Sequence, residues 1–113
     1  MKPIQSTAEY QQITAQSTPT VMVFSADWCP DCRYLDTYID EVVEAYQGRL
    51  EFYLVNRDEY ADLCESLDVL GIPSFIVYQS GQEVDRFVNS KRKFKPEVVA
   101  FLDGTLQELK VNK

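Results

Sequence analysis

The chain has 113 residues, of which 45% are apolar and 26% charged, a length and composition that suit one globular domain and argue against disorder. Its net charge of -7 argues against nucleic-acid binding, because contacts to phosphates require a basic face.

No segment of the chain has the pattern of a targeting signal or of a membrane-spanning helix. Residues 1–6 lack the apolar core of a signal peptide, and the apolar run at 21–24 is far too short to span a bilayer. We therefore expect a cytoplasmic protein that does not enter a membrane. In that reducing compartment, two close cysteines are more often catalytic or metal-binding than structural.

The apolar pattern predicts helices that alternate with strands. Residues 6–9 have the spacing of a capping box and predict a short first helix, with a weak apolar face formed by Ala8, Ile13 and Ala15. Residues 20–24 are an uninterrupted β-favouring run, typical of a strand buried on both faces. From Pro30 onward, one helix ending at Gly48 is predicted by apolar side chains at helical spacing: Leu35, Ile39, Val42, Val43 and Tyr46.

The second half continues this alternation. The predicted elements are a strand at 50–54, a helix at 58–67, a strand at 74–78, a turn at 80–81, an antiparallel strand at 83–88 and a last helix starting near Pro96. Strands that alternate with helices predict a parallel sheet, to which the closing hairpin adds an antiparallel edge. We therefore predict a single α/β domain over residues 1–113, with a central mixed β-sheet flanked by α-helices.

The segment Trp28-Cys29-Pro30-Asp31-Cys32 places two thiols three residues apart, at the start of a predicted helix. Free N–H groups at that helix start favour a thiolate on Cys29, which is therefore the predicted nucleophile. Cys32, one turn further in, is the predicted resolving thiol and should be less exposed. Such a pair suits a dithiol that attacks a disulfide and then releases the product by closing on itself.

Two further interpretations concern the charge and the metal-binding capacity of this motif. Asp31 adds negative charge beside the thiolate, which predicts a reductant rather than a strong oxidant. A zinc site would need four ligands, and the chain has no histidine and only one further cysteine, Cys64. Cys64 lies in an apolar register and is interpreted as a small buried hydrophobic residue. We expect neither a metal nor an organic cofactor.

Residues 23–32, Val-Phe-Ser-Ala-Asp-Trp-Cys-Pro-Asp-Cys, resemble the strand and active site of the thioredoxin family. Gly71-Ile72-Pro73-Ser74 is similar to that family's second signature, a cis-proline loop that faces the dithiol. The resemblance covers most of the chain and implies a thioredoxin fold in which Cys29 attacks and Cys32 resolves. It also implies a cis peptide bond before Pro73 and a set of substrate-binding residues: Trp28, Pro30, Asp31, Ile72 and Pro73.

The chain departs from the family pattern at several positions. Val23 replaces the buried aspartate that accepts the resolving thiol's proton in typical thioredoxins, and Leu54 replaces the lysine that accompanies it. Asp31 or water could take over that proton. Thr37 replaces a helix proline, which predicts a missing kink, and Asn89 or Ser90 replaces a glycine after the last strand.

The resemblance implies a monomeric thiol–disulfide oxidoreductase that reduces disulfides of proteins or small molecules, with a reductase or another thiol as electron donor. Two alternatives stay open: a thioredoxin-fold binding or redox-sensing module whose dithiol is regulatory, and a metal-handling protein. The basic stretch at 91–95 is interpreted as a solvated loop in preference to a dock for an anion or a reductase. The acidic residues of the helix after Cys32 are interpreted as a solvated surface: Asp36, Asp40, Glu41 and Glu44.

Overall fold

Five strands form one mixed β-sheet in the computed structural model, which describes residues 1–111. The strands are β1 (Lys2–Pro3), β2 (Thr20–Ser25), β3 (Glu51–Asn56), β4 (Ser74–Gln79) and β5 (Gln82–Phe87). Their order in the sheet is β1-β3-β2-β4-β5, with β3 parallel to both β1 and β2, and β4 antiparallel to both β2 and β5. The predicted α/β class and mixed sheet are confirmed, and β1 is an additional edge strand that the sequence did not indicate.

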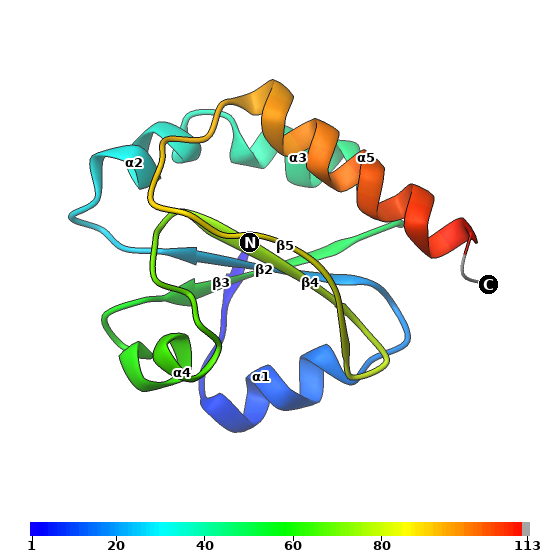
Figure 1. Ribbon diagram of the computed structural model, residues 1–113, viewed down its shortest axis with the longest axis horizontal. Coiled ribbons are helices and arrows are strands. Elements are labelled where there is room, and N and C mark those ends of the chain that lie inside the picture. Colours follow the sequence, from blue (N-terminus) through cyan, green and yellow to red (C-terminus); the bar gives the residue numbers. More distant parts are fainter. Residues whose placement is uncertain (112–113) are drawn as a thin grey trace.

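Helices cover both faces of the sheet (Figure 1). They are α1 (Thr7–Thr14), α2 (Pro30–Asp36), α3 (Ile39–Ala45), α4 (Ala61–Ser66) and α5 (Lys95–Val111). Alternate residues of β2 point to opposite faces, so Met22 and Phe24 pack with α1 and α4, whereas Val21 and Val23 pack with α2, α3 and α5. The sheet is therefore buried between two apolar layers. Within residues 1–111, no helix has the length and apolar character needed to cross a membrane.

β4 runs antiparallel to its neighbour β2, although the alternation of strands and helices predicts a parallel pair there. After β3 the chain forms the short helix α4 and re-enters the sheet at the end where β3 finished, which is also the end where β2 leads into the cysteine motif.

The predicted first helix is present as α1, although its buried face differs from the prediction. It is capped by Ser6, whose side chain accepts a hydrogen bond from the N–H group of Glu9. Tyr10 rather than Ala8 packs beside Ile13 on its buried face.

The helix predicted from Pro30 to Gly48 is interrupted between α2 and α3, so the kink is present without a proline. Thr37 uses its hydroxyl to donate a hydrogen bond of 2.6 Å to the carbonyl of Tyr34, which competes with regular helical bonding. The N–H groups of Thr37 and Tyr38 bond three residues back, as in a 3₁₀ turn. The prediction of a missing kink is therefore wrong.

Candidate functional site

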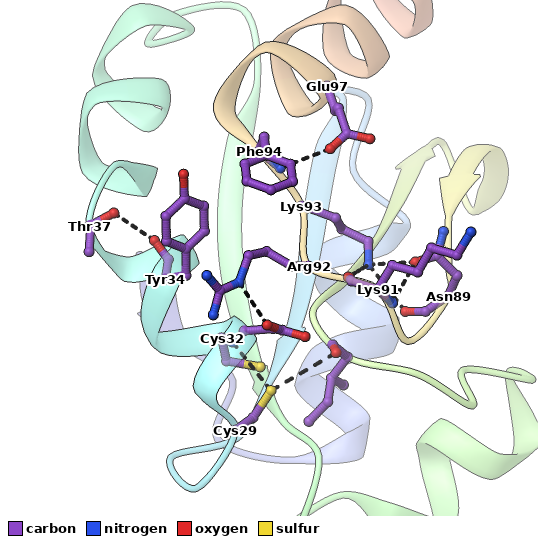
Figure 2. Close-up of polar contacts among 12 residues, drawn as sticks. Cys29, Cys32, Tyr34, Thr37, Asn89, Lys91, Arg92, Lys93, Phe94 and Glu97 are labelled. Carbon is purple, nitrogen blue, oxygen red and sulfur yellow. Dashed lines mark hydrogen bonds and ion pairs between the residues drawn. The ribbon is translucent and has the colours of Figure 1, made fainter.

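Cys29 is the N-cap residue of α2, four residues after the end of β2. Its backbone is extended, and Pro30 is the first residue of the helix. Its Sγ accepts a hydrogen bond of 3.2 Å from the N–H group of Cys32, in the manner of a helix N-cap (Figure 2). Such a bond strengthens when the sulfur carries a negative charge. Pro30 occupies the first helical position, where a missing N–H group costs nothing.

Cys32 is the more deeply buried thiol, at 1% exposure against 5% for Cys29, which is the expected order. Burial raises the pKa of Cys32 to about 11, and the neighbouring Cys29 acts in the same direction. A hydrogen bond from the hydroxyl of Ser25 partly opposes this rise. The free protein therefore holds Cys32 as a neutral thiol.

The cis-proline loop faces the dithiol. The Ile72–Pro73 peptide bond is cis, as the resemblance implies, and Sγ of Cys29 lies 4.0 Å from the carbonyl oxygen of Ile72 (Figure 2). Gly71 lets the backbone of Asn89 pack against the cis-proline loop, because a Cβ atom at residue 71 would lie only 2.4 Å from the backbone carbon of Asn89. Backbone groups of the loop are thus presented directly at the attacking sulfur.

Trp28 lies beside the dithiol on the protein surface, with 55% of the residue exposed. Its indole Nε1 donates a hydrogen bond of 2.8 Å to the carboxylate of Asp58, which fixes the ring on the loop after β3. Leu70, next to the cis-proline loop, is another exposed large apolar residue. Exposed apolar groups next to the cysteine motif and next to the cis-proline loop suit contact with a substrate chain.

The position of the usual buried acid is apolar in this chain. Val23 pairs with Leu54 in the register of β2 and β3, and Val23 is completely buried. The polar side chain that reaches Cys32 is instead that of Ser25, which our sequence analysis missed. A detectable signal was present: Ser25 is the first polar residue after the apolar run of β2, four residues before Cys29.

The interpretation of the basic stretch at 91–95 as a solvated loop is wrong for Lys93, whereas the exposed Lys91, Arg92 and Lys95 agree with it. Lys93 is 1% exposed, with its ammonium group enclosed by the loop that contains it. Arg92 donates a hydrogen bond of 2.8 Å from Nε to the carboxylate of Asp31, between the two cysteines (Figure 2). The acidic residues at 36, 40, 41 and 44 are exposed, as expected.

Cys64 is the buried residue of α4 and belongs to the same apolar layer as Cys29 and Cys32, where burial raises its pKa. It is 2% exposed, in agreement with its interpretation as a small buried hydrophobic residue. Within residues 1–111, no group of three or more His, Cys, Asp or Glu side chains is arranged to hold a metal ion.

Two free thiols at the start of one helix, one of them touching the backbone of an opposing proline loop, can exchange with a disulfide through the chemistry of the sulfurs themselves. The fold and this site define a thiol–disulfide oxidoreductase.

Comparison with known proteins narrows this class. The Thioredoxin family pattern matches residues 2–103, and the chain belongs to the thioredoxin family. It is 30% identical over 97 residues to mitochondrial thioredoxin-2 of Schizosaccharomyces pombe, covering 86% of this chain and 72% of that protein. Thioredoxin 1 of a Nostoc species is 29% identical over 83 residues, covering 74% and 78% of the two chains.

The fold is shared with solved thioredoxin structures. Thioredoxin from Trypanosoma brucei brucei superposes with a TM-score of 0.78 at 20% identity, over 95% of this chain and 88% of the other. A thioredoxin from Plasmodium falciparum gives a TM-score of 0.76 at 24% identity, over 95% and 98% of the two chains. The predicted thioredoxin fold is confirmed.

Proposed function

We propose that the chain, as one thioredoxin-like domain over residues 1–113, reduces disulfides of proteins or small molecules through Cys29 and Cys32. The observation that carries this proposal is the placement of Sγ of Cys29 between the N–H group of Cys32, at 3.2 Å, and the backbone carbonyl of Ile72, at 4.0 Å. The attacking sulfur is thus stabilised from its own helix and lies against a backbone edge that an extended substrate can use.

In the proposed cycle, the Cys29 thiolate attacks one sulfur of the substrate disulfide. A bond forms between Cys29 and that sulfur, and the other substrate sulfur leaves as a thiolate and takes up a proton. Cys32 then loses its proton and attacks Cys29, which closes the internal disulfide and releases the second substrate thiol. Two electrons pass from the dithiol to the substrate, and an external reductase or another thiol restores them.

The residues around the sulfurs have proposed roles in substrate binding. Ile72 and Pro73 offer the backbone edge, and Trp28 offers an exposed apolar surface beside it. Pro30 and Asp31 form the outer rim of the helix start. We propose that the protein acts as a monomer in the cytoplasm.

Single-cysteine variants test the assignment. Cys29→Ser should abolish reduction of an aromatic disulfide or of insulin, and Cys32→Ser should accumulate a mixed disulfide that mass spectrometry detects on Cys29. Cys64→Ser is the matched control, because Cys64 lies on α4, outside both the cysteine motif and the cis-proline loop, and it should keep its activity. Full activity in Cys29→Ser would refute the assignment. Loss of a protein partner in Pro73→Ala, with no turnover in the unmodified protein, would favour the binding-module alternative.

A further inference from the structure

Residues 89–94, which we term the bridging loop, connect β5 to α5 and join the two halves of the site. On one side, the backbone of Asn89 passes directly over Gly71 of the cis-proline loop, and its carbonyl accepts a hydrogen bond of 3.4 Å from the hydroxyl of Ser74. On the other side, Arg92 contacts Asp31 of the cysteine motif. The loop therefore spans from the substrate-facing backbone to the dithiol (Figure 2).

The ammonium group of Lys93 holds this loop in shape from the inside. Its Nζ donates to the backbone carbonyl of Asn89 at 3.1 Å, the side-chain oxygen of Asn89 at 2.9 Å and the carbonyl of Lys91 at 2.7 Å. Burial lowers the pKa of Lys93, while the nearby Asp31 opposes that change. The hydroxyl of Tyr38 donates to the carbonyl of Lys93 at 2.6 Å and ties the loop to the turn between α2 and α3.

Arg92 is held on two faces by this arrangement. Its Nε lies 2.8 Å from the carboxylate of Asp31, and its guanidinium carbon lies 4.6 Å from the centre of the Tyr34 ring. Tyr34 in turn packs edge-on against Phe94, with ring centres 5.5 Å apart. Although the ion pair is partly exposed, its geometry is fixed by stacking and by the buried Lys93 rather than by the pair alone.

The charge of Asp31 matters because it lies between the two sulfurs in sequence and on the same helical turn. An unpaired carboxylate there disfavours a thiolate and so destabilises the reduced, ionised dithiol relative to the disulfide. We propose that Arg92 is a positioning residue of the dithiol: by pairing with Asp31 it offsets that charge and sets the balance between the reduced pair and the Cys29–Cys32 disulfide.

This inference rests on the proposed redox role of the dithiol, and a double-mutant cycle tests it at equilibrium. The fraction of Cys29–Cys32 disulfide is measured against a series of reduced and oxidised glutathione in the unmodified protein, Arg92→Ala, Asp31→Asn and the double variant. A partly exposed pair corresponds to an effect of about two- to fivefold, so Arg92→Ala should raise the equilibrium constant for disulfide formation by that factor. In the Asp31→Asn background, the same substitution should have no effect.

A second readout and a matched control accompany the cycle. The rate at which iodoacetamide labels Cys29 at neutral pH should fall in Arg92→Ala and remain unchanged when Asp31 is already Asn. Lys95→Ala is the control, because Lys95 is about as exposed as Arg92 and forms an ion pair of 2.6 Å with Glu41, outside the cysteine motif. It should match the unmodified protein in both measurements.

The possible results separate the two proposals. If Arg92→Ala leaves both readouts unchanged, or shifts them equally in the Asp31→Asn background, the role of Arg92 is overturned while the redox role of the dithiol stands. If the unmodified protein forms no Cys29–Cys32 disulfide at any glutathione ratio, the proposed function itself fails. A shift in Arg92→Ala alone, absent from Lys95→Ala, supports the inference.

Discussion

Resolution of the mixed disulfide should depend steeply on pH, because Cys32 must lose a proton before it attacks. Burial raises the pKa of Cys32 to about 11. Only about one such thiol in ten thousand is ionised at neutral pH. As long as the pH stays below the pKa, the ionised fraction grows about tenfold for each unit by which the pH is raised. The rate of resolution should rise by the same factor. Part of the raised pKa comes from Cys29, whose charge is lost in the mixed disulfide, so the rise should level off below about 11.

Replacing Ser25 with Ala perturbs this step in a defined direction. The side chain of Ser25 lowers the pKa of Cys32. Ser25→Ala should therefore raise that pKa and leave less of Cys32 ionised at neutral pH. Because a thiolate of higher pKa is also a better nucleophile, resolution should slow by about threefold for each unit by which the pKa rises. Ser66→Ala removes an exposed serine of α4 and is the matched control.

Rapid mixing of the reduced protein with an aromatic disulfide separates the two steps. One coloured thiol is released when Cys29 attacks, and a second is released when Cys32 resolves. The second phase should carry the pH dependence and the effect of Ser25→Ala. A second phase that is flat from neutral to mildly alkaline pH would show that an internal base removes the proton, and an unchanged rate in Ser25→Ala would refute the role of the hydroxyl.

Three further predictions concern stability. Lys93→Met removes three hydrogen bonds that the buried ammonium group donates to partly buried acceptors and should lower the free energy of unfolding in urea by about 1–3 kcal/mol; an unchanged value would mean that the loop does not depend on the ammonium group. Gly71→Ala forces a Cβ atom to within 2.4 Å of backbone and should cost about 1–3 kcal/mol, whereas Gly104→Ala, with nothing within 4 Å in the middle of α5, should stabilise by up to about 1 kcal/mol. Burial raises the pKa of Cys32 to about 11 and that of Tyr38 to about 12, from ordinary values of 9.0 and 10.0, so the folded state retains protons that the unfolded state releases. Their contribution to stability is therefore complete below pH 9 and is lost as pH rises towards 12; a urea midpoint that stays constant across this window would contradict the assignment.

The sequence was sufficient for most of the fold because its elements carry strong local signals. The buried run of β2, the capping box at Ser6 and the hairpin turn between β4 and β5 each depend on residues close together in the chain. The break at Thr37 could not be predicted in this way. It depends on a side-chain hydrogen bond to Tyr34 and on the contact of Tyr38 with a loop more than fifty residues away.

The same division applies to the site. The cysteines, Trp28 and the Ile72–Pro73 bond were identified from short motifs, and the structure brings the thiols and the proline loop together. The bridging loop was misinterpreted because a run of basic residues usually lies in solvent. Lys93 is an exception because carbonyl groups two and four residues earlier in the chain turn inward and replace water around its ammonium group. That arrangement is a property of the loop's path, and composition does not indicate it.

The position of the charges near the dithiol leads to one more expected outcome. Val23 and the half-buried Leu54 place no ion pair at the position of the usual buried acid, and the ion pair next to the cysteines is instead the partly exposed pair of Asp31 and Arg92. Exposed charges are screened by salt, with a Debye length of about 10 Å at 0.1 M and about 3 Å at 1 M. In Arg92→Ala, the unpaired charge of Asp31 should therefore affect the sulfurs less as salt is added. The difference in the glutathione equilibrium between Arg92→Ala and the unmodified protein should shrink accordingly. A difference that persists at high salt would mean that Arg92 acts through the shape of the bridging loop rather than through its charge.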